Sequence, residues 1–223
     1  MIEFLENADT QLLLLLNGVH NAFFDEFFWL VTGKFAWIPM ILCLLYCTFR
    51  KNWKAGVLMI VAIALVITLC DQISSGIIKD AVCRLRPARD PDIADMVHIV
   101  NGYRGGQYGF VSSHAANSFG VAAFLALVLR NRAFTWTIML WAALLSYSRI
   151  YLGVHFPGDI ICGGLLGAML GMAVYYFYKK AKEWEYLSSV ESMNGRDSAL
   201  LVYTTVGNVL LILAASIIIY AMK

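Results

Sequence analysis

Long apolar stretches alternate with short charged ones along most of the chain. A helix that crosses a bilayer needs about 20 consecutive, mostly apolar residues. Six apolar stretches occur, at 35–49, 55–79, 113–129, 133–151, 159–178 and 199–222. Most are near this length; the first is shorter and is followed by basic residues. The pattern predicts an all-α fold, a polytopic membrane bundle of about six transmembrane helices.

The N-terminal stretch, residues 4–32, fits this pattern less well. Its leucine run at 12–16 is too short to span a membrane, and Asp25 and Glu26 interrupt the phenylalanines that follow. Short amphipathic helices with aromatic anchors lie in the membrane interface, so we expect such interfacial helices here. The first ten residues are acidic without a basic residue, and we therefore expect no cleaved signal peptide.

Composition agrees with a membrane protein. The chain is 60% hydrophobic and 14% charged, with a mean hydropathy of +0.69, whereas soluble domains are nearer half apolar and a quarter charged. A net charge of +2 leaves no surplus for binding nucleic acid. The five cysteines form no CxxC pair and no cluster with histidines, so we expect neither a metal site nor a cofactor. No obligatory protein partner is indicated.

Residues 148–159 place three ionisable side chains, Arg149, His155 and Asp159, between two apolar stretches. Ionisable groups at membrane depth are costly and are a functional hypothesis by default. His155 and Asp159 lie four residues apart, within reach if Pro157 opens the next helix. A carboxylate on one ring nitrogen fixes the tautomer and makes the other nitrogen a better nucleophile or base.

Two earlier segments are predicted to meet this one, because alternating spans bring their ends to the same face of the membrane. The first, 79–87, contains Lys79 and Arg86, and the second, 111–114, contains Ser112, Ser113 and His114. Three cations with few acidic residues nearby indicate that an anion binds here, and a phosphate suits arginine and lysine donors. Free backbone amides at a helix N-terminus would add to this anion-binding site. With two histidines, these residues predict a metal-free site for phosphoryl transfer.

The three segments resemble the motifs of the type 2 phosphatidic acid phosphatase superfamily. The matching residues are Lys79-x6-Arg86-Pro87, Val111-Ser112-Ser113-His114 and Ser148-Arg149-x5-His155-x3-Asp159. The second motif departs from the family's Pro-Ser-Gly-His, since valine replaces the proline and serine the glycine. The resemblance covers residues 55–178, which would form the catalytic core of a single membrane domain spanning 1–223, with 199–222 as an extra C-terminal helix.

The resemblance implies a role for each residue. His155 would be the nucleophile that forms a phosphohistidine, Asp159 would orient it, and His114 would be the general acid and then the base. Lys79, Arg86 and Arg149, with the amides of Ser112 and Ser113, would hold the phosphate.

The resemblance also implies a lipid phosphatase of the bacterial inner membrane. Candidate substrates are undecaprenyl diphosphate and a lipid A phosphate, which we favour, and phosphatidylglycerol phosphate and phosphatidate. A lipid-to-lipid phosphotransferase using the same site is the first alternative, and a transporter or channel a remote one. Outside the site, nine basic residues lie on the face opposite the motifs and five on the motif face, which favours a site on the periplasmic or outer side.

Other polar residues near the motifs have simpler interpretations. We expect Arg84, Arg89 and Arg104 to be solvated loop residues rather than contacts to a lipid headgroup. His20 and His98 are interpreted as incidental, and Tyr103 as loop packing or an interface anchor.

Overall fold

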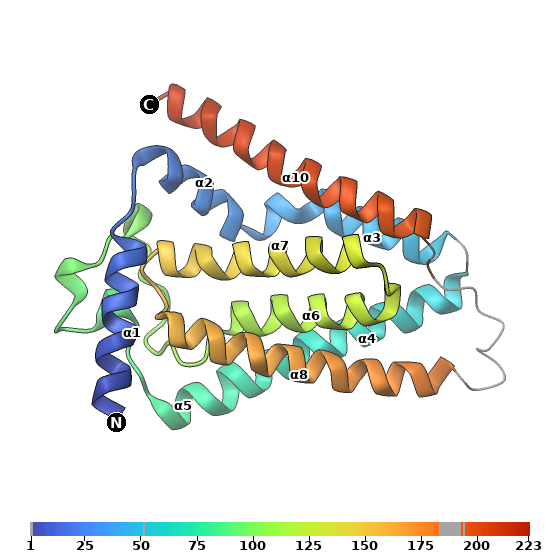
Figure 1. The fold of residues 1–223 in the computed structure, drawn as a ribbon, viewed down its shortest axis with the longest axis horizontal. Coiled ribbons are helices and arrows are strands. Elements are labelled where there is room, and N and C mark those ends of the chain that lie inside the picture. The colour runs from blue at the N-terminus through green and yellow to red at the C-terminus, as the bar shows by residue number, and fades with distance from the viewer. Residues whose placement is uncertain (1, 51, 183–192, 194) are drawn as a thin grey trace.

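The computed structural model of the protein describes residues 2–50, 52–182, 193 and 195–223, and its regular elements are helices (Figure 1). The all-α prediction is confirmed. The α-helices are α1 (Ile2–Asn17), α2 (Ala22–Thr32), α3 (Ile38–Phe49), α4 (Trp53–Asp71), α5 (Lys79–Val82), α6 (Ser113–Leu129), α7 (Arg132–Tyr151), α8 (Pro157–Lys182) and α10 (Gly195–Ala221).

Helices α4, α6, α7 and α8 run side by side along the long axis of the molecule, and α1 lies across one end of them (Figure 1). We call this the α1 end of the bundle. Helix α5, the start of α6, the end of α7 and the start of α8 all reach it. The opposite end carries basic residues at the helix termini: Arg50, Lys54, Arg130, Arg132, Lys179, Lys180, Lys182 and Arg196. Lys51, counted with them from sequence, lies outside the described residues.

Glycines on one face of α8 allow this helix to approach α6 closely. A Cβ atom added to Gly167 would lie 2.0 Å from the carbonyl oxygen of Ala116, and one added to Gly171 would lie 2.2 Å from that of Gly120. No larger residue fits at either distance. Small residues commonly permit such backbone contact between membrane helices. This contact fixes the N-terminus of α6 beside the N-terminus of α8, where the site residues lie.

Three helical segments are long and apolar enough to cross a membrane, namely Trp53–Val82, Pro157–Lys182 and Gly195–Ala221. Helix α2 and residues 34–49, bent by 67° to each other, pass the same test together and can form a fourth, broken span. Helix α6 is apolar but shorter. The protein is thus an integral membrane protein, while the count of six spans and the interfacial placement of residues 4–32 stay predictions.

The segment Trp53–Val82 is one continuous helix whose hydrogen-bonding pattern changes along its length. Between α4 and α5, residues 72–78 form a π-helical stretch, η2, of the kind often found at functional sites. Helix α5 ends at Cys83, which has a left-handed backbone with φ of 53°. From there residues 83–112 form a loop with short 3-10 turns that leads back to α6.

Candidate active site

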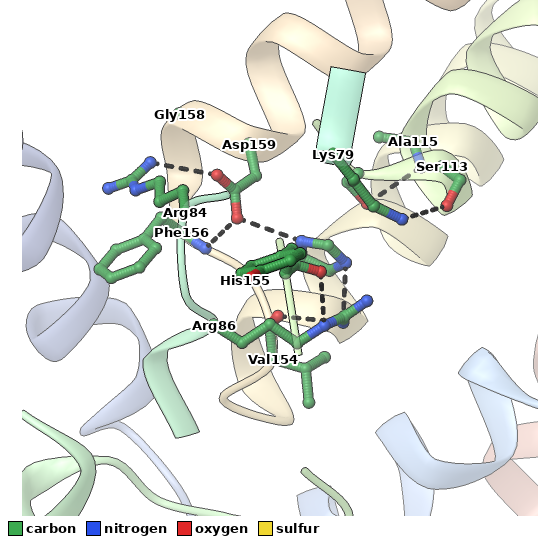
Figure 2. A network of polar contacts seen from close by, with 12 residues as sticks. Lys79, Arg84, Arg86, Ser113, Ala115, Val154, His155, Phe156, Gly158 and Asp159 are labelled. Atoms are coloured by element: carbon green, nitrogen blue, oxygen red, sulfur yellow. Dashed lines mark hydrogen bonds and ion pairs between the residues drawn. The ribbon is translucent and has the colours of Figure 1, made fainter. Parts of the chain in front are cut away.

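The structure brings all eight predicted site residues to the α1 end of the bundle. Lys79 begins α5, Ser113 and His114 begin α6, Arg149 lies in the last turn of α7, and His155 and Asp159 flank the start of α8. Arg86 and Ser112 lie in the loop between α5 and α6. Figure 2 shows His155 between Asp159 and Arg86, with Lys79 nearby. Three motifs far apart in sequence therefore share one site.

His155 and Asp159 form a buried pair. Nδ1 of His155 lies 3.1 Å from Oδ2 of Asp159, and the backbone N–H of Phe156 donates to the same oxygen over 3.1 Å. Neither His155 nor Asp159 is exposed. Pro157 opens α8, as predicted, and a proline is favoured in this position because the first helical N–H has no intrahelical acceptor. The pairing turns Nε2 of His155 away from Asp159.

Arg86 occupies the other side of the imidazole. Its NH1 group lies 3.1 Å from Nε2 of His155 and donates to the carbonyl oxygen of Val154 over 3.2 Å, while Nε donates to the carbonyl oxygen of Tyr108 over 3.1 Å. Because an arginine can only donate, Nε2 of His155 must accept and Nδ1 must carry the proton. The lone pair of His155 therefore faces the cations.

The surroundings keep His155 neutral. Burial lowers its pKa well below the ordinary value of 6.5, and the charges of Arg86, Arg149 and Lys79 lower the pKa further. A neutral imidazole with an unprotonated Nε2 is the form required of a nucleophile.

Lys79 is held by serine hydroxyls. Its ammonium donates to Oγ of Ser113 over 2.9 Å and to Oγ of Ser75 over 3.3 Å, and the two hydroxyl oxygens lie 3.2 Å apart. Ser113 stands where the family usually has glycine. Its side chain thus joins the cation cluster instead of obstructing the turn.

The amides at the start of α6 do not all behave as expected. The N–H of Ser112 donates to the carbonyl oxygen of Asp159 over 3.0 Å, and Oγ of Ser112 accepts from the N–H of Ala115. Ser112 therefore caps α6 and ties it to α8, and its amide is not free for an anion as expected from sequence. The first-turn amides of Ser113 and His114 have no acceptor within the helix and form the better seat.

Arg149 is buried between the loop and α2. NH1 donates to Oγ1 of Thr32 over 2.7 Å and NH2 to the hydroxyl of Tyr103 over 3.3 Å. Nε is buried with no hydrogen-bond partner among the described residues. Burial raises the pKa of Tyr103, but the hydrogen bond and charge of Arg149 outweigh it and lower the pKa. Tyr103 is thus a contact of Arg149, which its interpretation as loop packing missed.

His114 differs from His155 in exposure, since its side chain is exposed whereas that of His155 is fully buried. It lies in the first turn of α6, directly after Ser113. Within the described residues, no group of three or more histidine, cysteine, aspartate or glutamate side chains is placed to hold a metal ion. The positive charge of the site comes from Lys79, Arg86 and Arg149.

Arg84 was expected to be a solvated loop residue, and this expectation was wrong. Its NH1 group donates to Oδ1 of Asp159 over 3.1 Å, and its guanidinium stacks 3.8 Å from the ring centre of Phe156 (Figure 2). NH2 of Arg84 lies 2.8 Å from Oδ2 of Asp9. A buried aspartate beside a neutral histidine needs a cation, but the sequence does not show which arginine of the loop supplies it.

The remaining polar residues have structural contacts. Arg89 donates to the carbonyl oxygens of Gly105 and Gly106, and Arg104 to that of Ala88, so both close the loop on itself. The rings of His20 and His98 stack 3.7 Å apart, and Nε2 of His98 lies 2.8 Å from Asp25.

Comparison with known proteins agrees with this geometry. The model of the PAP2 superfamily matches residues 55–183. A lipid A 4'-phosphatase of Bacteroides thetaiotaomicron is 47% identical over 182 residues, 81% of each chain, and one of Porphyromonas gingivalis is 41% identical over 81% of this chain and 77% of its own. The crystal structure of Aquifex aeolicus LpxE superposes with a TM-score of 0.59 and 26% identity, covering 75% of this chain and 94% of that one. The chain belongs to the PAP2 superfamily.

Proposed function

We propose that this PAP2-type lipid phosphatase removes a phosphate from the 4' position of a lipid A-type glycolipid. The proposed substrate rests on one observation: the chain is 47% and 41% identical to two proteins named lipid A 4'-phosphatase, in each case over 81% of this chain. An undecaprenyl-diphosphatase of Sulfolobus acidocaldarius and a phosphatidylglycerophosphatase B of Bacillus subtilis are only 28% and 29% identical, over 61% of the chain. Among the substrates considered from the sequence, we therefore favour lipid A.

In the proposed first step, Nε2 of His155 attacks the phosphorus atom. The P–N bond forms as the bond from phosphorus to the lipid oxygen breaks, and His114 gives its proton to that oxygen. Arg86 must exchange its contact with Nε2 for a phosphate oxygen, because the same lone pair makes the new bond. Asp159 stabilises the positive charge that develops on the ring through Nδ1.

In the second step, His114 accepts a proton from water, which attacks the phosphohistidine. The P–N bond breaks, inorganic phosphate leaves, and Nε2 regains its lone pair. Lys79, Arg86, Arg149 and the first-turn amides of α6 hold the charge on the phosphate oxygens through both steps. Fixed cations and dipoles of this kind supply a large part of the rate enhancement in phosphoryl transfer.

An apolar groove beside the site supports an amphiphilic substrate. It encloses a volume of about 530 Å³ between α1, α5 and α8, and Arg84 and Asp9 are among its lining residues. Its apolar lining includes Leu5, Leu12, Val82, Phe110 and Ile161. We propose that an acyl chain of the substrate enters here while its phosphate meets the cations. The basic residues at the other end of the bundle support a site on the periplasmic side of the inner membrane.

The test is phosphate release by the purified protein in detergent from a panel of lipid phosphates. The panel contains lipid A phosphorylated at both positions, at the 1 position alone or at the 4' position alone, with undecaprenyl diphosphate, phosphatidylglycerol phosphate and phosphatidate. We expect the highest kcat/KM with the two forms that carry the 4' phosphate. Faster hydrolysis of the 1-phosphate or of a non-glycolipid would overturn the substrate assignment. Transfer of the phosphate to a second lipid, seen by mass spectrometry, would favour the phosphotransferase.

A further inference from the structure

The second carboxylate oxygen of Asp159 has a partner that the family motifs do not include. Oδ2 faces His155, whereas Oδ1 accepts from Arg84 over 3.1 Å. Asp159 has no exposed surface, and a carboxylate buried in this way is strongly destabilised unless a cation compensates it. Arg84 therefore stabilises the ionised form of Asp159, which is the form that holds the proton on Nδ1 of His155.

Arg84 is in turn held by the N-terminal helix. Oδ2 of Asp9, in α1, lies 2.8 Å from NH2 of Arg84, and Oδ1 of Asp9 accepts from the backbone N–H of Gly158 over 2.7 Å. A Cβ atom at position 158 would lie 2.7 Å from Oδ2 of Asp9, so the glycine permits this approach. One carboxylate of α1 thus binds both Arg84 and the first turn of α8.

The ring of Phe156 fixes the plane of the guanidinium. The centre of the ring lies 3.8 Å from Cζ of Arg84, a distance at which a cation is attracted to an aromatic face. With Asp9 on one edge, Asp159 on the other and Phe156 against its face, Arg84 is restricted to one orientation. A planar fork with two donor groups is suited to bridging two carboxylates, and a lysine is not.

We propose that Arg84 and Asp9 are positioning residues for the nucleophile: Arg84 fixes Asp159 and thereby His155, and Asp9 of α1 fixes Arg84. The inference rests on the proposed function because it takes His155 as the nucleophile. Helix α1 lies outside residues 55–183, which the family model matches. The N-terminal helix is thus a working part of the site as well as a neighbour of the apolar groove.

This chain of contacts predicts an effect on kcat rather than on KM. Asp9 and Arg84 border the apolar groove, but they contact each other, Asp159 and Gly158 rather than the groups that hold the phosphate. Their loss should therefore impair the orientation of His155 much more than ground-state binding. Replacing an outer partner of a metal-ligating histidine typically costs about 10- to 100-fold in affinity or activity, and we take the same scale for His155. We expect a fall of that size in kcat for Arg84→Gln, with KM within twofold of the parent. Arg84→Lys, which keeps the charge but not the fork, should recover part of the loss.

The decisive measurement is a double-mutant cycle between the two residues. If Asp9 acts through Arg84, Asp9→Asn lowers kcat in the parent but has no further effect in the Arg84→Gln background. Glu3→Gln, which removes an exposed carboxylate from the same helix, is the control and should leave kcat unchanged. All variants are assayed on the lipid that the parent hydrolyses fastest, and melting temperature and gel filtration in detergent report folding.

Several results would overturn the proposal. They are an Arg84→Gln variant with parental kcat, a loss expressed only in KM, or a cycle in which the two losses add. If Arg84→Gln does not fold, an Asp9→Asn or Arg84→Lys protein that folds and keeps parental kcat has the same meaning. A parent that releases phosphate from no lipid in the panel would instead refute the proposed function. The two failures are therefore distinguished by the parent alone.

Discussion

Arg86 donates from NH1 to Nε2 of His155 over 3.1 Å, so a proposed phosphate-binding residue and the proposed nucleophile are in direct contact. The contact determines the tautomer of His155, because the ring nitrogen that accepts from an arginine cannot itself carry a proton. It also places a donor group where the phosphate must enter. An incoming phosphate therefore replaces one hydrogen-bond acceptor of Arg86 with another and releases the lone pair of His155.

The first prediction is that His155→Ala abolishes phosphate release while the protein remains folded. Loss of a nucleophile should reduce kcat by several powers of ten, roughly 10⁴-fold or more. His20→Ala, at the α1 end but in contact with His98 rather than with the phosphate-binding residues, is the control and should keep parental activity. Rapid acid-free quenching with a radiolabelled substrate should trap a phosphoprotein in the parent and none in His155→Ala. Activity of His155→Ala within a few-fold of the parent would contradict the assignment.

The second prediction concerns the planar guanidinium of Arg86. Arg86→Lys should lower kcat/KM by roughly 100-fold or more, because an ammonium cannot reproduce the two-pronged contact of a guanidinium with phosphate oxygens. Arg89→Lys in the same loop is the control. Arg89 is exposed and contacts only backbone carbonyls among the hydrogen bonds described, so its replacement should change kcat/KM less than threefold. Equal kinetics for Arg86→Lys and the parent would show that Arg86 does not bind the phosphate.

The third prediction is a pH dependence of stability. The pKa of His155 lies well below its ordinary value of 6.5 in the folded protein, first because of burial and then because of Arg86 and Arg149. As the pH falls through 6.5, the unfolded chain gains a proton on this histidine that the folded protein does not. The contribution of His155 to folding stability is therefore fully present above pH 6.5 and is lost progressively as the pH falls below it.

Melting temperatures in detergent between pH 7.5 and 5 measure this effect. His155→Gln removes the titrating group, so its melting temperature should fall less on acidification than that of the parent. Arg89→Lys, which exchanges one exposed cation for another, serves as the control, with the parental slope expected. Identical slopes for the parent and His155→Gln would show that His155 does not resist protonation.

The sequence predicted the contacts that depend on short spacings along the chain. His155 and Asp159 lie four residues apart, and the structure pairs their side chains over 3.1 Å. The alternation of spans correctly placed all three motifs at one end of the bundle, since each crossing reverses direction.

The residues missed from sequence depend on packing between distant elements. Asp9 lies 75 residues before Arg84, and Thr32 is 117 residues from Arg149. No periodicity links such pairs, and helices α1 and α2 were assigned to the interface because of their length and composition alone. The amide of Ser112 was misassigned because its role as a cap that also binds Asp159 depends on how α6 meets α8.

The last prediction is that the site faces away from the cytoplasm, and Cys83 can report it. Cys83 is exposed at the end of α5, on the α1 end of the bundle, whereas Cys47 and Cys70 are buried. A thiol reacts with maleimide only where water reaches it. With the other exposed cysteine removed by Cys162→Ser, a membrane-impermeant maleimide should label Cys83 in intact spheroplasts.

The matched control is Lys180→Cys in a Cys83→Ser and Cys162→Ser background, because Lys180 is exposed near the far end of α8. That protein should be labelled only after the membrane is opened. The reverse pattern, with position 180 labelled in intact spheroplasts and Cys83 protected, would place the site in the cytoplasm and make its substrate a lipid of the inner leaflet.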